Sequence, residues 1–485
     1  MRTAIAAGVM VLAVLLASAA SAPAPLPALR LRRAVPMSGL EHLRKLDRTR
    51  FVRRSQGVGE FALLSLPGIY YANVKFGSPP KEYSLQFDTG SDLMWVSCSS
   101  CTSCPDTNNL GITLEFYDPK NSSTSSNISC SDHRCKEAIK AGHSVCQAFD
   151  SPNNQCAYDV AYAGAATSGF YVSDTMYFDT VMPIGNEEAT SPSASVIFGC
   201  SNSRSSNLLA DGIMGFGKNS PSIILQLNSQ GVSPKVFSHC LKSSEDGGGI
   251  LVLGEIVKPG IVFTPLVQSQ ARYNLNMKSI VVNGQNIRLN SSLFTTSNTQ
   301  GTFVDSGTSL SYLADGVYDP VISAIDNAVP QSIRAYFFQG DLCYIIELNS
   351  SRSNLSLFPI LTLQFEGGAR MTVDPVNYLL RKGTSANPHD VDIMCIGFLR
   401  SKELEGYEHI TILGDLVLQD KIIVYNLEEM QLGWLDYNCS LLNKTTTPVT
   451  ASFSRSFKRH TPSYCSGLMI ALVVAIIIAP WRLDM

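Results

Sequence analysis

The chain has 485 residues, which is too many for one ordinary hydrophobic core, so two or more domains are expected. Hydrophobic residues make up 45% and charged residues 16%, with a formal net charge of −3, a globular balance that excludes a disordered chain. Short Val-, Ile-, Thr-, Ser- and Gly-rich runs end at Gly, Pro, Asn or Asp and predict a mostly β protein. One helix is expected over about residues 315–329, because Pro330 ends it.

The N-terminus has the pattern of a secretory signal peptide. Arg2 precedes an apolar stretch that ends near Leu16 and is followed by small residues, so we expect a signal peptide over 1–19. Residues 30–54 then carry nine Arg or Lys against two acidic residues. This segment is either a solvated basic linker or, as we favour, part of a propeptide over 20–60. Entry into the secretory route excludes a nucleic-acid-binding arm.

Two near-identical aspartate loops are the most informative feature of the chain. Gln86–Ser91 and Phe303–Thr308 both read apolar, Asp, Ser or Thr, Gly, Ser or Thr, and their aspartates lie 217 residues apart (305 − 88). Coincidence is the alternative, but two such loops after apolar, strand-like runs are rarely found by chance. The repeat predicts two similar lobes, 61–265 and 266–445, with a cleft at their interface.

The loop composition suits hydrolysis of an amide by an activated water molecule. Each Gly allows a tight turn and a close approach of the two loops, here Gly90 and Gly307. Asp88 and Asp305 would share one proton, so that one carboxylate acts as general base while the protonated partner polarises the scissile carbonyl. The chemistry needs no metal and no cofactor. Short side chains with a hydroxyl group can donate hydrogen bonds to the carboxylate oxygens, and the loops supply four of them: Thr89, Ser91, Ser306 and Thr308.

Further landmarks stand in a definite order around these loops. Trp95 follows the first loop, Tyr162–Gly169 is a Tyr-led loop, and Asp211–Gly217 and Ile412–Asp415 are apolar-apolar-Gly elements. With the two Asp loops, this pattern resembles the pepsin-like aspartic protease family, in the nepenthesin-type form that plants use. The resemblance implies a mostly β, bilobal fold with two pseudo-twofold-related lobes.

The resemblance also implies roles for the site residues. Thr89 and Ser306 would cross-link the two loops, while Ser91 and Thr308 would bond the outer carboxylate oxygens. Tyr162 would close over the substrate as the tip of a flap that includes Gly164, steadied by the indole N–H of Trp95. The family's flap usually reads Tyr-Gly-Asp-Gly-Ser, whereas this chain reads Tyr-Ala-Gly-Ala-Ala, so we expect an altered specificity or a lower rate.

These features predict an aspartic endopeptidase with an acid optimum that acts on protein or peptide substrates as a monomer. In such zymogens a basic prosegment lies over an acidic cleft and is released in acid. The alternative is a catalytically weak or silent relative that binds proteins, glycans or inhibitors. The intact Asp loops favour the enzyme.

Thirteen cysteines fit an oxidising compartment. Cys98, Cys101 and Cys104 have a spacing that is compatible with zinc, but the seven His are scattered, so disulfides are favoured. Cys343 is expected to pair with Cys395, with Cys200–Cys439 as a weaker expectation and Cys465 left over. The N-terminal set, which resembles the Cys-rich insertion of nepenthesin-type enzymes, is Cys98, Cys101, Cys104, Cys130, Cys135, Cys146 and Cys156.

The C-terminal tail and the sequons support a luminal route. Residues 446–466 form a polar spacer before a hydrophobic C-terminal segment, 467–485. Its apolar run, 467–481, is short for a bilayer span and ends almost at the C-terminus. This pattern favours a GPI signal with Ser454 as the attachment site, and membrane contact through that anchor; a short transmembrane anchor is the rival. Glycosylation candidates are Asn121, Asn127, Asn290, Asn349, Asn354, Asn438 and Asn443.

Overall fold

The computed structural model describes most of the chain between residues 69 and 441. The described ranges are 69–108, 112–140, 142, 144–146, 154–162, 165–180, 193–205, 208–243, 247–338, 340–347, 355–384 and 391–441, with only the backbone given for 27–33, 179–180, 347, 382–384 and 391–392. All of these residues belong to one compact unit, Ala24–Ala451. The predicted features that lie outside the described residues are the signal peptide, the tail with Ser454 and Cys465, Gly164, Asn349, Asn354 and Asn443.

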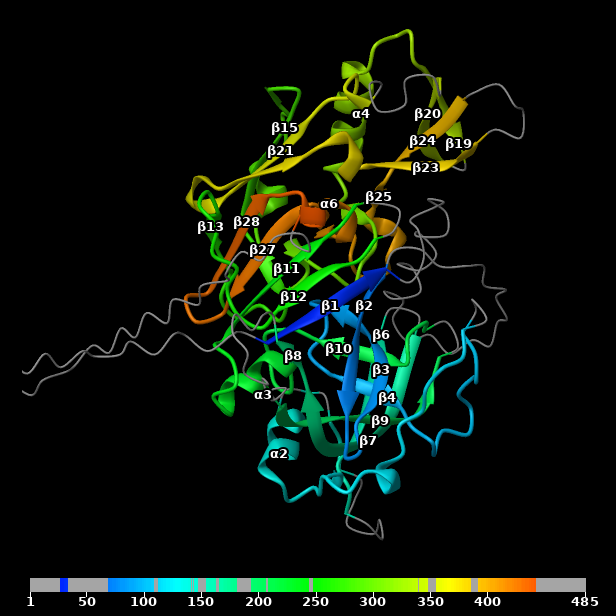
Figure 1. Ribbon diagram of the computed structural model, residues 1–485. Helices are drawn as coiled ribbons and strands as arrows, with labels where there is room; N and C mark the ends of the chain where they lie inside the picture. The colour runs from blue at the N-terminus through cyan, green and yellow to red at the C-terminus, as the bar shows by residue number, and fades with distance from the viewer. Residues whose placement is uncertain are drawn as a thin grey trace, which may run out of the picture. The chain divides into compact units, whose positions relative to one another are not determined.

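Strands dominate this unit, as the sequence predicts (Figure 1). In the described part, one sheet of fifteen strands follows the order β13-β28-β27-β11-β12-β1-β2-β3-β10-β4-β9-β7-β5, with β6 on β7 and β8 on β1. Its strands are β1 (Pro27–Arg33), β2 (Tyr70–Phe76), β3 (Lys81–Asp88), β4 (Trp95–Ser97), β5 (Ser126–Asn127), β6 (Ala157–Tyr162), β7 (Ala165–Tyr177), β8 (Asp179–Thr180), β9 (Ser193–Arg204), β10 (Gly212–Gly215), β11 (Val236–Leu241), β12 (Gly249–Val252), β13 (Val262–Pro265), β27 (Lys421–Asn426) and β28 (Gln431–Asp436).

Three smaller sheets and a few short helices complete the described part. The sheets follow the orders β14-β17-β26-β18-β25, β16-β15-β21-β22 and β19-β20-β24-β23. Their strands are β14 (Tyr273–Leu275), β15 (Met277–Val282), β16 (Gln285–Asn286), β17 (Gln300–Val304), β18 (Ser311–Leu313), β19 (Arg334–Phe338), β20 (Asp341–Glu347), β21 (Leu361–Phe365), β22 (Arg370–Val373), β23 (Leu379–Thr384), β24 (Val391–Ile396), β25 (Phe398–Arg400) and β26 (His409–Leu413). The α-helices are α2 (His133–Lys140), α3 (Ile223–Ser229), α4 (Tyr318–Ala328) and α6 (Asp415–Leu418), and the 3-10 helices are η1 (Pro119–Asn121), η2 (Ser291–Phe294), η4 (Glu366–Gly368), η5 (Pro375–Asn377), η6 (Ser401–Glu403) and η7 (Cys439–Leu441).

The repeat in the sequence corresponds to a repeat in topology. In the first half, β3 runs parallel to β10, β10 antiparallel to β4, and β4 parallel to β9. In the second half, β17 runs parallel to β26, β26 antiparallel to β18, and β18 parallel to β25. β3 and β17 each lead into an Asp loop, and β10 and β26 each come from an apolar-apolar-Gly element. The chain is therefore mostly β, with two related halves.

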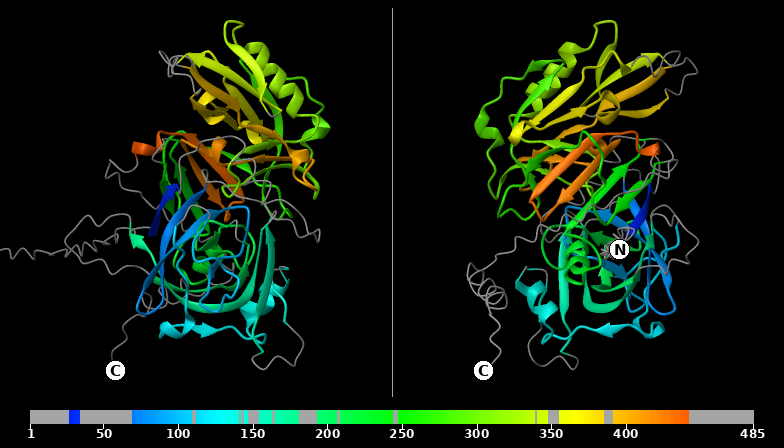
Figure 2. Two further views of the ribbon diagram at one scale, coloured as in Figure 1. Left: turned by 90° about the vertical axis from the view of Figure 1, so that its right-hand side faces the viewer. Right: turned by 60° about the vertical axis from the view of Figure 1, so that its left-hand side comes forward.

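A layer of strands from both halves lies between the two repeated sets, as Figures 1 and 2 show. β27, near the end of the described chain, pairs antiparallel with β11, and β28 pairs with β13. Phe237 of β11 stacks on Tyr425 of β27 with ring centroids 4.4 Å apart. Because these inward-facing side chains are fully buried, this layer joins the cores of the two halves.

The segment expected to be a propeptide contributes one strand. Only Pro27–Arg33 of residues 20–60 is described, and it forms β1 between β2 and β12. Its register places Leu31 opposite Ala72 and Ala28 opposite Val252. This part of the basic segment therefore lies in the sheet, where its backbone pairs with a strand on each side.

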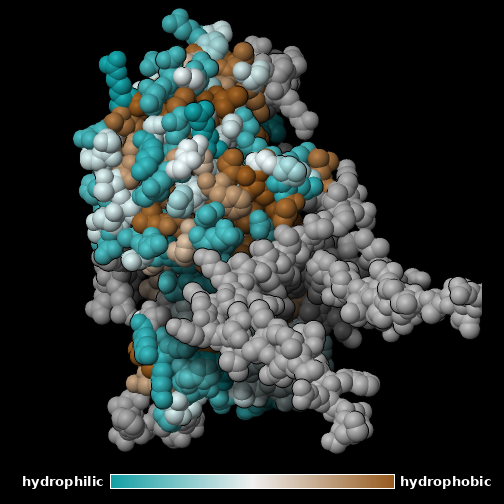
Figure 3. Space-filling view, turned by 90° about the vertical axis from the view of Figure 1, so that its left-hand side faces the viewer, coloured by the Kyte–Doolittle hydropathy of each residue, from teal (hydrophilic) through white to brown (hydrophobic). Residues whose placement is uncertain are grey.

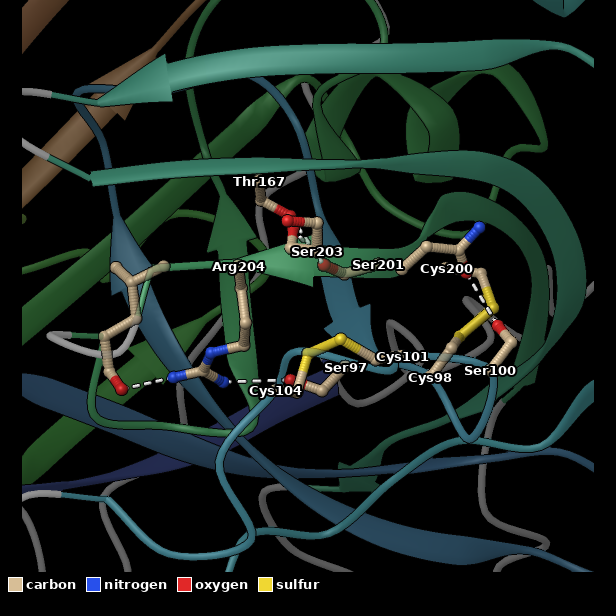
Figure 4. The surroundings of a disulfide bond; sticks show 12 residues. Ser97, Cys98, Ser100, Cys101, Cys104, Thr167, Cys200, Ser201, Ser203 and Arg204 are labelled. Carbon is tan, nitrogen blue, oxygen red and sulfur yellow. Dashed lines mark hydrogen bonds between the residues drawn. A yellow bond between two sulfur atoms is a disulfide. The ribbon is translucent and has the colours of Figure 1, made fainter. Parts of the chain in front are cut away.

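Six disulfides staple the described residues. Cys98 at the end of β4 bonds to Cys200 of the parallel neighbour β9, beside the short Cys101–Cys104 loop (Figure 4). Cys130–Cys146 and Cys135–Cys156 follow, and three of these four sulfur atoms lie within 4.8 Å of one another. That cluster has metal-like spacing, but its sulfurs are in disulfides, as are the three cysteines at 98, 101 and 104.

The expected Cys343–Cys395 bond is present in the structure. The expectation of a Cys200–Cys439 bond is wrong. Cys200 faces Cys98 across two hydrogen-bonded strands, with Cα atoms 5.3 Å apart. Cys439 follows β28 and bonds to Cys240 on β11, with Cα atoms 5.5 Å apart. The pairing with Cys240 therefore ties the two halves together through the shared layer.

The described surface is mixed in character. Hydrophobic and hydrophilic residues are intermixed on the face drawn in Figure 3. The sequon residues Asn121, Asn127, Asn290 and Asn438 are all exposed, so their geometry leaves room for a glycan. Among the helices of the described ranges, none is both long and apolar enough to cross a bilayer.

Loss of the Cys240–Cys439 bond should destabilise the protein more than loss of the local Cys101–Cys104 bond. The first closes a loop of 199 residues and the second a loop of three. Chain-entropy arguments give about 5 kcal/mol for the former and about 1.5 kcal/mol for the latter. Urea unfolding of the Cys240→Ser/Cys439→Ser and Cys101→Ser/Cys104→Ser double variants would measure both. Equal losses in the free energy of unfolding would contradict the larger stabilising role of the Cys240–Cys439 bond.

Candidate functional site

The two Asp loops meet at the interface of the two halves. Asp88 ends β3 and Asp305 directly follows β17, and neither carboxyl group is exposed. The loops are joined by a reciprocal pair of hydrogen bonds. The backbone N–H of Ser306 donates to the Thr89 hydroxyl at 2.9 Å, and the backbone N–H of Thr89 donates to the Ser306 hydroxyl at 3.1 Å. Each loop thus satisfies buried backbone groups of the other.

The environment of the two carboxylates is nearly symmetric. Gly90 N–H donates to Asp88 Oδ1 at 2.8 Å, and the Ser91 hydroxyl donates to Oδ2 at 2.6 Å. On the other loop, Gly307 N–H and the Thr308 hydroxyl donate to the corresponding oxygens of Asp305 at 2.9 and 2.7 Å. Every carboxylate oxygen therefore has a donor from its own loop, which fixes both carboxyl groups in place and supports negative charge on either one.

Gly90 shows how closely the loops approach. A Cβ atom added to Gly90 would lie 2.4 Å from Asp305 Oδ1 and 2.6 Å from Oδ2. No real Cβ contact is that short, so any side chain here would push the loops apart. The glycine of the apolar-apolar-Gly elements has the same use, because a Cβ at Gly414 would lie 2.1 Å from the Leu310 carbonyl oxygen.

A hairpin presents Tyr162 to the site. β6 and β7 pair so that Tyr162 lies opposite Ala165, with residues 163–164 at the tip outside the described ranges. The indole N–H of Trp95 donates to the Tyr162 hydroxyl at 2.9 Å. Burial, reinforced by the nearby Asp88 charge, raises the pKa of Tyr162 well above its usual range, so the phenol stays protonated. Tyr162 is therefore a neutral phenol in the wall of the cleft, with its hydroxyl held by Trp95.

Arg204 contacts Trp95 through a cation–π interaction. Its guanidinium lies 5.6 Å from the centroid of the indole ring and donates to the Ser97 hydroxyl at 2.9 Å (Figure 4). It also donates to the Ala210 carbonyl at 2.8 Å. Burial lowers the pKa of Arg204 to about 10, so it is still a cation at any acid or neutral pH.

A cleft of about 890 Å³ opens beside the two loops. Residues from both halves line this cleft. Its volume is large enough for several residues of an extended peptide. From the first half come Thr89–Leu93, Val160–Tyr162 and Gly217, and from the second half come Gln270–Arg272, Asn274, Ser297–Gln300, Phe303 and Gly406–Ile410.

Beneath the loops lies a layer of buried aromatic rings. Tyr425 contacts Thr89 through its hydroxyl, and its hydroxyl also lies 3.3 Å from Nε2 of His239. His239 packs edge to face on Phe87, the residue before Asp88, with centroids 5.3 Å apart. Burial lowers the pKa of His239 to about 3, and its Nδ1 has no hydrogen-bond partner within the described ranges. The layer therefore includes a neutral imidazole directly behind the carboxylates.

The structure brings together the site residues that the sequence pointed to. Thr89, Gly90, Ser91, Ser306, Gly307 and Thr308 surround the two aspartates, and Trp95 contacts Tyr162. Sequence reasoning missed Arg204, His239, Arg272 and Tyr425, because each acts across contacts between distant segments. It also missed Cys240. The seven cysteines of the N-terminal segment are an odd number and require one partner outside it, which is Cys200, and this pairing leaves Cys240 for Cys439.

Comparison with known proteins agrees with this geometry. Residues 70–255 match the family model described as "Xylanase inhibitor N-terminal" and residues 272–435 match "Xylanase inhibitor C-terminal". The chain is 35% identical over 424 residues to Aspartic proteinase 36 of Arabidopsis thaliana, covering 85% of this chain and 83% of that protein. It is 32% identical to Aspartic proteinase 39 of Arabidopsis thaliana, covering 83% and 82%, and 27% identical to Aspartic proteinase nepenthesin-2 of Nepenthes gracilis, covering 77% and 78%.

A mostly β protein with two related halves, paired Asp loops and a cleft between them is a pepsin-like protein by fold and site. The chain belongs to the pepsin-like aspartic protease family of plants.

Replacing His239 should make the protein more resistant to acid. Its pKa is about 3 in the folded protein against 6.5 when unfolded, so below pH 6.5 the unfolded chain binds a proton that the folded chain does not. This group therefore removes up to about 1.4 kcal/mol of stability per pH unit as the pH falls from 6.5 towards 3. Urea unfolding between pH 3 and 7 should give a flatter profile for His239→Phe than for the wild type. The exposed His133→Gln is the matched control and should leave the profile unchanged.

Proposed function

We propose that this protein is an aspartic endopeptidase that hydrolyses peptide bonds with a water molecule activated between Asp88 and Asp305. The observation that carries the proposal is the symmetric cradle of two buried carboxylates, each bonded by a glycine N–H and a hydroxyl of its own loop. The names of its relatives, aspartic proteinases at up to 35% identity, support protease activity in general.

The proposed reaction needs one proton between the two carboxyl groups. The ionised carboxylate takes a proton from the water molecule while the water oxygen attacks the scissile carbonyl carbon, and the protonated partner gives its proton to the carbonyl oxygen. The tetrahedral intermediate then collapses, the C–N bond breaks, and the departing nitrogen receives a proton from the dyad. Since one group must be protonated and the other ionised, activity falls on both sides of an acid optimum at about pH 3–6.

Tyr162 and Trp95 would act on the substrate side of this dyad. A substrate in the cleft lies between the Asp loops and the β6–β7 hairpin, so closure of the hairpin excludes water. The Trp95 bond holds the Tyr162 ring in one orientation. The small residues at the tip, Ala163, Gly164 and Ala165, leave the flap slim and without the charged or hydroxyl side chain common in the family.

A catalytically silent binding protein is the second candidate, because the matching family models are described as xylanase inhibitor halves. The same cleft would then hold a protein segment without cleaving it. Against this, both aspartates keep their donors, and the cross-link between the loops is complete. Turnover by the purified protein separates the two candidates.

We further propose a route through the secretory pathway. Six disulfides and four exposed sequon asparagines fit an oxidising, glycosylating compartment. The propeptide, the GPI signal with Ser454 and its rival, a short transmembrane anchor, stay predictions from the sequence. Treatment of intact cells with phosphatidylinositol-specific phospholipase C would release the protein only in the first of the two anchoring cases.

Asp88→Asn and Asp305→Asn should each abolish cleavage of a denatured protein at acid pH while leaving the fold intact. Both groups act in one step, so the double variant should be little worse than either single variant. Cleavage would be measured from pH 2.5 to 8, with circular dichroism as the folding check and an exposed carboxylate variant, Glu137→Gln, as the control. Substantial activity in a purified single variant, or an optimum near pH 8, would refute the shared-proton mechanism.

Tyr162→Ala should lower kcat about ten- to hundredfold, because the flap no longer closes the cleft over the substrate. Tyr162→Phe keeps the ring but loses the acceptor of the Trp95 N–H, so it should have a smaller effect. Steady-state kinetics on one peptide would measure both. If Tyr162→Ala turned over as fast as the wild type, the hairpin would have no role in the reaction.

A further inference from the structure

Arg272 lines the cleft and binds the Asp88 loop. It precedes β14, and its Nη1 donates to the Gly90 carbonyl at 3.2 Å, while Nη2 donates to the Tyr407 hydroxyl at 2.8 Å. Gly90 is the residue whose Cα faces the Asp305 carboxyl group. A substrate whose scissile bond lies over the dyad therefore has a side chain within reach of this guanidinium.

The guanidinium is held rigidly. It lies over the ring of Phe303 at 4.9 Å from the centroid and beside the Tyr407 ring at 5.7 Å. The preceding residue is also tied to the first half, because the Asn219 side chain donates to the Ala271 carbonyl at 3.1 Å. Since Arg272 is already ordered, a ligand that binds it would lose little side-chain entropy on binding.

Arg272 keeps unused hydrogen-bonding capacity. Its two hydrogen bonds use two of five N–H groups, and within the described ranges no carboxylate forms an ion pair with it. The guanidinium stays partly exposed in the cleft wall. A half-buried arginine with free, coplanar donors is the side chain best suited to a carboxylate ligand.

We propose that Arg272 is a specificity-determining residue that makes the cleft prefer peptides with a Glu or Asp side chain next to the scissile bond. The inference rests on the proposed endopeptidase function and names its substrate class. It assigns recognition, not chemistry, to Arg272: the arginine contacts the substrate carboxylate, and the dyad cleaves the neighbouring amide.

The preference should depend on pH, because Asp and Glu side chains ionise with ordinary pKa values near 4. At pH 3 the substrate side chain is neutral and the preference should vanish, whereas at pH 5.5 it should reach about tenfold in kcat/KM. Acidic groups in the cleft wall repel an acidic substrate and therefore limit the preference in kcat/KM. The titratable and charged groups around the cleft are Asp88, Asp92, Tyr162, Lys218, Asp305, Tyr407, Glu408 and His409.

The test compares matched peptides that carry Glu or Gln at each position flanking one cleavage site. The readout is the Glu-to-Gln ratio of kcat/KM at pH 3 and 5.5 for the activated wild type, Arg272→Gln, Arg272→Lys and the exposed control Arg334→Gln. We expect a ratio of about ten at pH 5.5 for the wild type and the control, a reduced ratio for Arg272→Lys, and a ratio near one for Arg272→Gln. A wild-type ratio near one at pH 5.5, or a ratio that Arg272→Gln leaves unchanged, overturns the proposal.

Binding separates this inference from the proposed function. The affinity of the same peptides is measured by fluorescence for the Asp88→Asn variant and for the Asp88→Asn/Arg272→Gln double variant. This measurement needs no turnover. If the wild type cleaves no peptide yet the Glu preference in binding disappears with Arg272→Gln, the recognition stands and the protease function fails. If peptides are cleaved but neither assay shows a Glu preference, the function stands and the role of Arg272 is refuted.

Discussion

The reciprocal hydrogen bonds between Thr89 and Ser306 are the constraint on which the site depends. Each loop places a hydroxyl where the other loop has a buried backbone N–H, so neither loop is satisfied unless both halves have folded and docked. The close approach leaves room for no side chain at Gly90, and it buries both carboxyl groups. The loop sequence is therefore duplicated because the same hydrogen bond, from a backbone N–H to a hydroxyl, is made twice, once in each direction.

Most of the site was predictable because its chemistry is local. A loop that holds its own carboxylate needs Asp, a hydroxyl residue and Gly within four positions, and that pattern is visible in Asp88–Ser91 and Asp305–Thr308. The strand-rich, two-lobed fold followed from the repeat. Contacts between distant segments left no such pattern. Cys240 gives no hint of Cys439, and Arg272 reads as an ordinary surface arginine until the fold places Gly90 and Tyr407 beside it.

The aromatic layer behind the dyad connects activity with stability. Tyr425 reaches Thr89 from the shared strands, and Phe237 and His239 pack around it, so the loops rest on side chains from both halves. A neutral imidazole in this place fits tightly among rings, but it works against folding in acid. The proposed acid-active site would thus lie beside a core residue that disfavours folding in acid, and the long-range disulfides offset part of that cost.

The shared strand layer also has a consequence for synthesis of the chain on the ribosome. β11 gains its neighbour β27 only after nearly two hundred further residues have been made, and Cys240 waits equally long for Cys439. Until then the first half has an unpaired strand edge and an unpaired thiol, and both can form wrong contacts, the thiol above all in the oxidising compartment of the proposed secretory route. The first half of a nascent chain of this protein therefore stays open to mispairing at that edge until the last strands emerge.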